Sequence, residues 1–159
     1  DDFFNTLGHI ARMLPVMPLF GGKTRFQPVY VGDVAEAVAA AAMGKAKPGT
    51  IYELGGPEIV SNRELTERVL HYTNRRNPIL PLPAGVGTLL AIPMGLMPKP
   101  LLTSDRVRLL GLDNVVSHAA TAERRTLASF GIVPVPLDAV LPSYLWRFSP
   151  NGQFDRQTA

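Results

Sequence analysis

The stretch RFQPVYVGDVAEAVAAA, residues 25–41, changes its hydrophobic spacing halfway along, and this change constrains the fold more than any other feature. Its first part is rich in β-branched and aromatic residues, which suit a strand. From Val34 onward the apolar residues follow helical spacing. Asp33 stands at the change with Glu36 three residues later, the pattern of a capping box at a helix start. The sequence therefore predicts a short strand over 26–31 that turns directly into an alanine-rich helix.

A second unit of the same kind follows. The segment GTIYELGG, residues 49–56, is a compact apolar run between turn residues and predicts another strand. Ser61 then precedes a helical pattern, and Glu64 completes a second capping box. Strand, helix, strand and helix over residues 26–74 are typical of an α/β layer rather than of a helical bundle.

The rest of the chain is predicted to be largely helical. Residues 1–14 have the spacing of an amphipathic helix, and the proline- and glycine-rich residues 15–25 predict a loop or a short extended arm. Further helices are expected over 104–117, over 121–132 with Gly131 as a left-handed C-cap, and over 137–148.

The chain length of 159 residues predicts a single α/β domain over residues 1–150, followed by a polar tail over 151–159. The sequence opens inside the first predicted helix and has no initiator methionine. We therefore expect the chain to be part of a longer protein.

Composition excludes several classes of function. The chain has no cysteine, which rules out disulfides and thiolate chemistry. Its net charge of +3 comes with arginines in pairs that lack interleaved aromatic residues, and this pattern disfavours binding to nucleic acid.

Residues 78–98 carry no charge, and a segment of this length could span a bilayer. Its five prolines and three glycines argue against a clean transmembrane helix. A short strand followed by a buried or surface-docked helix is the favoured interpretation. A patch that faces a membrane or a partner protein is the alternative.

Searches for chemical motifs give negative results. The three histidines have no carboxylate or cysteine at ligand spacing, so no metal site is predicted. The sequence has no nucleophile elbow, no Walker loop and no glycine-rich dinucleotide fingerprint. No tyrosine has a lysine four residues later. We therefore predict no catalytic residue and expect the chain alone to be inactive.

Two motifs carry a resemblance to a known family. FQPVYVGDVAEAV, followed about twenty residues later by YELGGPEIVSNRELTERV, resembles the C-terminal half of extended and atypical short-chain dehydrogenases/reductases. Three further matches point to one branch, the NAD(P)H-binding accessory subunit of respiratory complex I and its bacterial relatives. These matches are the opening DDFFN, the stretch QPVYV and the ending SFGIVPVPLDAVLPSYL.

The resemblance implies an α/β fold in which this chain is the C-terminal, substrate-side part and the N-terminal nucleotide-binding Rossmann half is absent. It implies NADP or NAD in the intact protein, and none for this chain alone. Arg25 and Gln27 correspond to positions that touch substrate or the outer end of the cofactor, or are polar residues of an edge strand. Tyr30 either points into the ligand cleft or packs, and Phe4 is either a pocket wall or part of the helix core.

Two functions follow from the resemblance. In the first, the intact protein is a non-catalytic accessory or assembly subunit of NADH:quinone oxidoreductase. Its partners are the missing Rossmann half and subunits of the respiratory complex or a membrane surface, and its place is cytoplasmic and peripheral at the inner face of the inner membrane. In the second, it is an active NAD(P)-dependent oxidoreductase or a sugar-nucleotide epimerase/dehydratase whose catalytic residues lie in the missing half.

Overall fold

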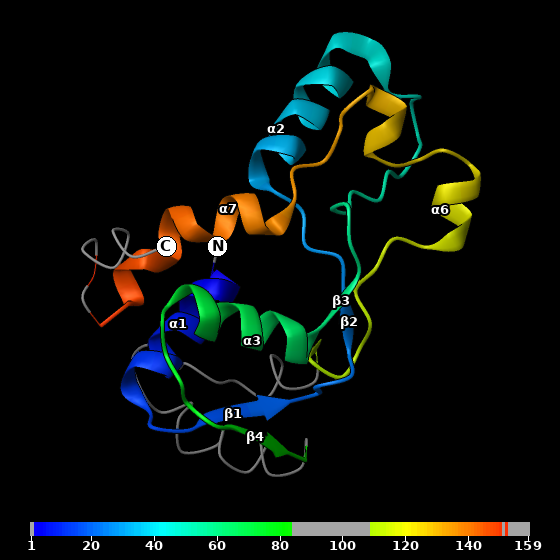
Figure 1. Cartoon of the computed structure of the whole chain (residues 1–159). Helices are drawn as coiled ribbons and strands as arrows, with labels where there is room; N and C mark the ends of the chain where they lie inside the picture. The colour runs from blue at the N-terminus through cyan, green and yellow to red at the C-terminus, as the bar shows by residue number, and fades with distance from the viewer. Residues whose placement is uncertain (1, 84–108, 151, 153–159) are drawn as a thin grey trace, which may run out of the picture. The chain divides into compact units, whose positions relative to one another are not determined.

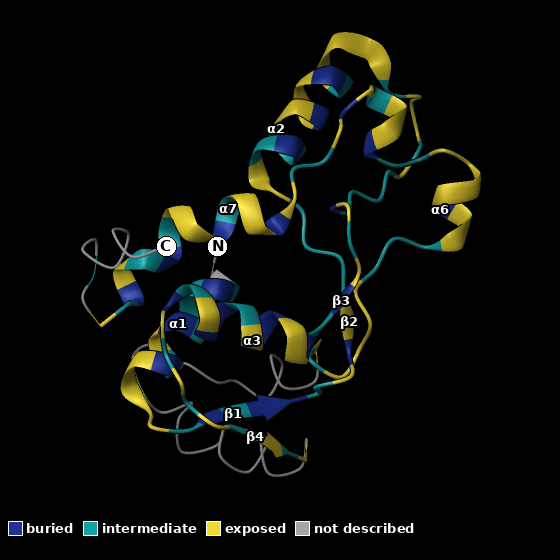
Figure 2. Cartoon of the chain, viewed as in Figure 1, coloured by how far each residue is buried: buried dark blue, intermediate teal, exposed yellow. Residues whose placement is uncertain are grey.

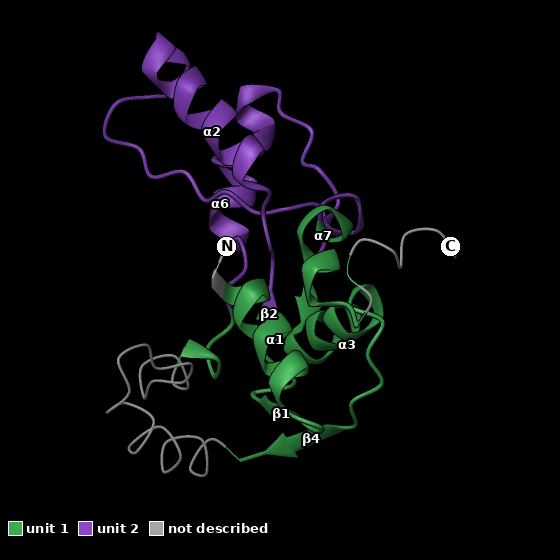
Figure 3. Cartoon of the chain, turned by 90° about the vertical axis from the view of Figure 1, so that its left-hand side faces the viewer, with its two compact units in different colours: residues 1–25, 60–113, 141–159 green, residues 26–59, 114–140 purple. Residues whose placement is uncertain are grey.

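The computed structural model of the chain describes residues 2–83, 109–150 and 152. The chain divides into two compact units (Figure 3). Unit 1 is drawn from residues 1–25, 60–113 and 141–159, and unit 2 from residues 26–59 and 114–140. A single domain over 1–150 stays a prediction, and the polar tail predicted over 151–159 lies outside the described residues apart from Gly152.

Unit 1 combines helices with a small parallel sheet (Figure 1). Helix α1 (Asp2–Met13) packs against helix α3 (Asn62–Tyr72) and against the short helix η3 (Trp146–Phe148). Strands β1 (Met17–Phe20) and β4 (Ile79–Leu82) pair in parallel. Buried residues, dark blue in Figure 2, occur on the helices and on β1 of this unit, among them Phe4, Ala11, Met17, Leu65, Val69, Leu141, Leu145 and Phe148.

The predicted capping box at the start of α3 is confirmed. The Ser61 hydroxyl oxygen accepts a hydrogen bond from the Glu64 N–H at 3.2 Å, and the Ser61 N–H donates to Glu64 Oε2 at 2.6 Å. The bonds that Ser61 donates to the Glu64 carboxylate, first from its N–H and then from its hydroxyl, hold the pKa of Glu64 below its usual range. The cap fixes the first turn, and Leu65 and Val69 on the inner face are fully buried as expected.

Strand β1 lies where the sequence predicted only a loop or an extended arm. Its partner β4 is about sixty residues further along, with Met17 opposite Ile79 and Phe20 opposite Leu82. Strand β4 confirms the short strand expected at the start of residues 78–98. The remainder of that apolar segment, and residues 104–108 of the helix predicted over 104–117, lie outside the described residues. Over residues 110–117 the predicted helix is wrong, because the chain turns there and Asn114 bridges to Phe26 instead.

Unit 2 is built around helix α2 (Val31–Ala40), which continues into the wider turn η1 (Ala41–Lys45). Gly44 has φ +84° there, a left-handed conformation that ends the helix. Two short helices, α6 (His118–Ala122) and η2 (Leu127–Phe130), come from the second segment of the unit. The core cluster consists of Ala37, Leu127 and Ile132, with Val29, Leu54 and Phe130 packed against it.

The start of α2 corrects the first prediction. The strand expected over 26–31 is reduced to β2 (Arg25–Phe26), which pairs with β3 (Val60–Ser61) in a second two-stranded sheet. The N-cap of α2 is Tyr30, without a side-chain hydrogen bond, so the capping box predicted for Asp33 is wrong. The Val34 N–H already bonds to the Tyr30 carbonyl oxygen at 3.2 Å, which places Asp33 inside the first helical turn rather than before it.

The strand predicted over residues 49–56 is also wrong, because residues 51–56 form no strand. A strand needs ladder bonds to a neighbouring strand, whereas this segment is bonded to a turn. The Glu53 N–H donates to the Arg125 carbonyl oxygen at 2.9 Å, and the Arg125 guanidinium donates to the Ile51 carbonyl oxygen. The fold is therefore mixed α/β with a small parallel sheet, and the strand–helix–strand–helix layer predicted over 26–74 is not formed.

The two last predicted helices are found with altered bounds. The helix expected over 121–132 is divided into α6 and η2, and its C-cap is confirmed. Gly131 has φ +75°, and the Ile132 N–H bonds back to the Leu127 carbonyl oxygen at 3.3 Å. The helix expected over 137–148 is formed by α7 (Leu137–Leu145) and η3.

Candidate functional site

Gln27, a predicted cleft residue, has both ends of its side-chain amide bonded to backbone within unit 2. Its Nε2 donates to the Gly56 carbonyl oxygen at 2.9 Å, and its Oε1 accepts from the Val116 N–H at 2.9 Å. A Cβ at Gly55 would lie 2.6 Å from the Gln27 side chain, so the glycine allows this close approach. Gln27 thus joins three segments of unit 2, and its amide has little remaining capacity for a ligand.

Arg25 forms a bidentate pair with Asp113 in unit 1. The Arg25 N–H donates to Asp113 Oδ1 at 2.7 Å, its Nε donates to Oδ2 at 2.9 Å, and a second guanidinium nitrogen lies 2.8 Å from Oδ2. The backbone N–H of Arg25 first, and then its side chain, lower the pKa of the Asp113 carboxyl. The Arg25 side chain remains 59% exposed, so the outer edge of its guanidinium reaches solvent.

Tyr30 and Phe4 differ strongly in exposure. Tyr30, the N-cap of α2, is 39% exposed, and its ring lies against Gly32, where an added Cβ would be 2.4 Å away. Phe4 is only 3% exposed and contacts Phe3 edge-on with 5.2 Å between the ring centroids. Tyr30 is therefore open to a ligand, whereas Phe4 belongs to the core of unit 1.

The four predicted cleft residues are divided between the units: Phe4 and Arg25 lie in unit 1, Gln27 and Tyr30 in unit 2. The contacts described for each of them run to other residues rather than to one another. Their assignment to one cofactor or substrate cleft stays a prediction.

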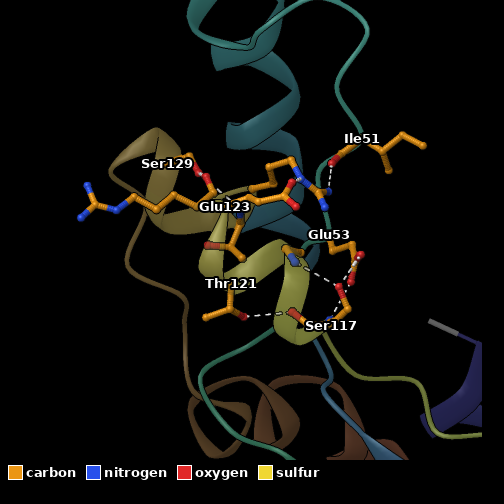
Figure 4. A network of polar contacts seen from close by, with 10 residues as sticks. Ile51, Glu53, Ser117, Thr121, Glu123 and Ser129 are labelled. Carbon is orange, nitrogen blue, oxygen red and sulfur yellow. Dashed lines mark hydrogen bonds and ion pairs between the residues drawn. The ribbon is translucent and has the colours of Figure 1, made fainter.

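A polar network that the sequence did not reveal lies in unit 2 (Figure 4). The Glu53 carboxylate accepts the Ser117 N–H at 2.7 Å and the Ser117 hydroxyl at 2.9 Å. The backbone N–H of Ser117, then its hydroxyl, and more weakly the Arg125 charge, lower the pKa of Glu53. The Ser117 hydroxyl oxygen also accepts from the Ala120 N–H at 3.1 Å and so caps α6.

Arg125 extends the network by hydrogen bonds to Glu123 and to Ile51. Its Nε donates to Glu123 Oε2 at 2.7 Å while its guanidinium reaches the Ile51 carbonyl oxygen (Figure 4). The bonds of Ile51 and Glu53 join residues 51–53 to the turn around α6, and the Ser117 hydroxyl, which a nucleophile would need free, donates to Glu53. We therefore assign the network to the folding of unit 2 rather than to catalysis.

Unit 1 has a hollow of about 500 Å³ lined by Asn5, Thr6, His9, Arg12, Arg147 and Phe148. Arg147, from the other end of the chain, donates to Asn5 Oδ1 at 2.6 Å and completes the wall. The hollow therefore concentrates basic side chains that lie far apart in the sequence.

The starts of α2 and α3, the two longest helices after α1 among the described residues, do not fit the phosphates of a dinucleotide, which need free N–H groups and little negative charge. At α3 the first N–H groups are taken by the Thr24 and Gly22 carbonyl oxygens and by the Ser61 hydroxyl. At α2 the first turn contains the Asp33 carboxylate, which is buried and repels an anion. Residues of these two turns therefore provide no phosphate site.

Two searches of the described part of the chain bear on metals and membranes. Residues 2–83, 109–150 and 152 contain no group of three or more histidine, cysteine, aspartate or glutamate side chains that could hold a metal ion. Over the same residues, no helix has both the length and the apolar character needed to cross a bilayer.

Comparison with known proteins supplies the remaining evidence. No protein-family model matches the chain. The chain is 32% identical, over 96% of its length, to the NADH dehydrogenase (ubiquinone) 1 alpha subcomplex subunit 9, mitochondrial, of Arabidopsis thaliana. It is 30% and 29% identical, over 87% of its length, to the subunits of the same name from Rattus norvegicus and Mus musculus.

The chain spans 40% of the length of the Arabidopsis subunit and 36% of the length of the two rodent subunits. The similarity covers nearly all of the chain and recurs in a plant and two mammals. The chain is therefore similar to part of subunit 9 of the alpha subcomplex of mitochondrial NADH dehydrogenase.

Proposed function

We propose that this chain is the C-terminal, substrate-side part of an NAD(P)H-binding protein related to the short-chain dehydrogenases, which serves as a non-catalytic accessory or assembly subunit of NADH:quinone oxidoreductase. One observation carries the proposal: the similarity over 96% of the chain to a subunit of the NADH dehydrogenase alpha subcomplex.

The chemistry of the chain supports a role without catalysis. Hydride transfer in short-chain dehydrogenases is accompanied by proton transfer, which needs a positioned acid or base. The sequence has no tyrosine with a lysine four residues later. The described carboxylates with lowered pKa, those of Glu53, Glu64 and Asp113, are each held by hydrogen bonds to neighbouring backbone. Groups arranged in this way stabilise the fold and are poor proton carriers at neutral pH.

In this proposal the NADP or NAD is held by an N-terminal Rossmann half, because the starts of α2 and α3 do not fit its phosphates. Arg25 and Tyr30 are the residues of this chain that would touch the outer end of the cofactor, since both side chains reach solvent. Gln27 and Phe4 would act indirectly, the first by joining backbone segments and the second by packing α1 into the core of unit 1.

We further propose that the intact protein lies at the inner face of the membrane that carries the oxidoreductase, in contact with other subunits or with the bilayer surface. The names of the relatives support this, since they place those proteins in mitochondria and in the alpha subcomplex. The arginine pairs of this chain would suit an anionic neighbouring surface.

The test uses the full-length protein that contains this chain, tagged in the cells that produce it. Membranes are solubilised in a mild detergent and separated on a native gel, and both the tag and NADH:quinone oxidoreductase activity are followed. We expect the tag to migrate with the activity and to stay with it after a high-salt wash. A tag that migrates alone at the size of a monomer contradicts the assembly role.

A second measurement addresses the cofactor. Calorimetric titration of the purified full-length protein with NADPH and with NADH should show tight binding of one of them, without oxidation of the bound cofactor. An Arg25→Gln variant should bind the cofactor more weakly, whereas Arg76→Gln, which removes the same charge from another exposed position, should not. Turnover of NADPH with a carbonyl compound or a sugar nucleotide would instead support the active oxidoreductase or epimerase.

A further inference from the structure

The hollow of unit 1 is formed where the two ends of the described chain meet. Helix α1 supplies Asn5, Thr6, His9 and Arg12, and η3 supplies Arg147 and Phe148. Asn5, His9 and Arg12 are three or four residues apart, so they share one face of α1. This face and the short helix together enclose about 500 Å³.

Helix η3 is held firmly against α1. Gly8 makes the close packing possible, because an added Cβ there would lie 2.6 Å from the Phe148 ring. Arg75, which follows the C-terminal end of α3, also holds η3 in place: its Nε donates to the Phe148 carbonyl oxygen at 2.9 Å. The Phe148 side chain is fully buried and contacts the His9 ring edge-on with 4.9 Å between centroids. The wall of the hollow is thus preorganised rather than loose.

The polar side chains that line the hollow can all donate hydrogen bonds, and two of them, Arg12 and Arg147, carry a positive charge. Arg147 donates to the neutral Asn5 Oδ1 and lies over the Phe148 ring, with 5.2 Å from its central carbon to the centroid. Because neither contact is an ion pair, the charge of Arg147 is not neutralised by them. Arg12 has no hydrogen-bond or ion-pair partner among the described residues. The described residues that line the hollow include no carboxylate.

The geometry of Asn5 adds a further donor. Arginine can only donate, so the Asn5 oxygen faces Arg147 and the Asn5 NH₂ group is left to point elsewhere. Two arginines, a histidine, an asparagine and a threonine thus line one space, and each of these side chains has a group that can donate a hydrogen bond. A phosphate group presents several acceptor oxygens and nearly two negative charges at neutral pH, which suits more donors than a single carboxylate can use.

We propose that this hollow is a binding site for the phosphate group of a small phosphate-bearing molecule, with Arg12 and Arg147 as its principal charged contacts. None of the residues that line the hollow is one that the proposed function assigns to the outer end of the cofactor, Arg25 or Tyr30. The shared chemistry admits two sources, a soluble phosphate compound and the headgroup of an anionic lipid, and the experiment distinguishes them.

The first arm is an NMR titration of the full chain with inorganic phosphate at low ionic strength, following the backbone amides of α1 and η3. We expect saturable shifts that are confined to these two elements. Arg12→Gln should weaken phosphate binding about tenfold, which corresponds to about 1.4 kcal/mol. Arg76→Gln removes the same charge from an exposed position outside the hollow and should change the affinity about twofold or less.

A second variant keeps the test independent of folding. Asn5→Asp preserves the shape of the side chain and its contact to Arg147, but it places a carboxylate inside the hollow. We expect it to weaken phosphate binding about tenfold or more while leaving the thermal stability of the chain unchanged or raised. A merely structural role of Asn5 would not produce this combination.

The second arm measures flotation with phosphatidylcholine vesicles that do or do not contain phosphatidic acid. Binding of inorganic phosphate that Arg12→Gln and Asn5→Asp weaken assigns the site to a soluble phosphate compound. Binding only to vesicles with phosphatidic acid, weakened by the same two variants, assigns it to a lipid headgroup. The proposal is overturned if neither probe binds saturably, or if Arg76→Gln weakens binding as much as Arg12→Gln does.

Discussion

Replacing Asp33 tests how unit 2 is held together. The Asp33 side chain is 5% exposed, and its Oδ2 accepts a hydrogen bond from the Val135 N–H at 2.9 Å. The two residues are 102 positions apart, so this bond joins the two segments from which unit 2 is made. Asp33→Ala removes the acceptor and leaves the Val135 N–H without its partner.

The magnitude follows from two contributions. A hydrogen bond to a charged group contributes about 1.5–3 kcal/mol to the free energy of unfolding, and more of this is lost when the remaining partner stays buried. A carboxylate in the first turn of a helix adds about 0.3–1 kcal/mol through the helix dipole. We expect Asp33→Ala to cost about 2–4 kcal/mol. Asp33→Asn keeps an acceptor oxygen and should cost about 1 kcal/mol, the charge-dependent part.

Hydrogen exchange at the Val135 amide reports on this bond directly, because the amide exchanges only after the bond to Asp33 opens. The free energy of that opening falls when unit 2 is destabilised. A loss of about 2 kcal/mol corresponds to exchange about 30-fold faster in Asp33→Ala. The matched control is Glu36→Gln, an exposed carboxylate one turn along α2, for which we expect a change below about 0.5 kcal/mol. A capping box would require Glu36 as much as Asp33, so equal effects of Glu36→Gln and Asp33→Asn would refute this account of α2.

Three further outcomes are expected. Because the pKa of Glu64 is lowered in the folded chain, its bonds to Ser61 stabilise α3 above the ordinary value of 4.5 and are lost as the pH falls through the folded value. Urea unfolding as a function of pH should therefore show a smaller acid loss for Glu64→Gln. Gln27→Ala removes two bonds and leaves the Val116 N–H unpaired, which should lower stability by about 2 kcal/mol and the Tm by about 5 °C in calorimetry. Gly56→Ala would place a Cβ 1.9 Å from a backbone carbonyl oxygen and should cost about 1–3 kcal/mol in the same assay, whereas an unchanged Tm would contradict this packing.

A local sequence pattern predicted the structure correctly where the pattern allowed only one interpretation. The spacing from Ser61 to Glu64 lies within one helical turn, and the structure forms that capping box. Asp33 and Glu36 have the same spacing and do not form one. An acidic residue before a helical run fits both the N-cap and the third helical position, and both are favourable for a carboxylate. In the structure, Asp33 lies inside the helix and bonds to the Val135 N–H, which is too far along the chain for a local sequence pattern to include it.

Strands were predicted less well, because a strand depends on its partner. Strand β1 forms because residues 79–82 pair with it. Its sequence, MPLF, contains a proline, and for that reason the segment was predicted to be a loop or an extended arm. Residues 51–56 have strand composition, yet their hydrogen bonds go to Arg125 and Gln27. The composition of a segment shows whether its residues are compatible with a strand. Whether a strand forms also depends on a second segment that pairs with it, and the sequence does not identify that segment.

The candidate sites show the same limit at the level of side chains. Family resemblance selected Arg25, Gln27 and Tyr30 by their place along the chain, and it could not show that the Gln27 amide is taken by backbone groups. The hollow of unit 1 depends on a bond between Asn5 and Arg147, which are 142 positions apart. In sequence, each arginine of the hollow looks like a solvated surface charge. Only when α1 and η3 meet do the two charges face one space without a carboxylate, and this juxtaposition is what makes an anion the expected ligand.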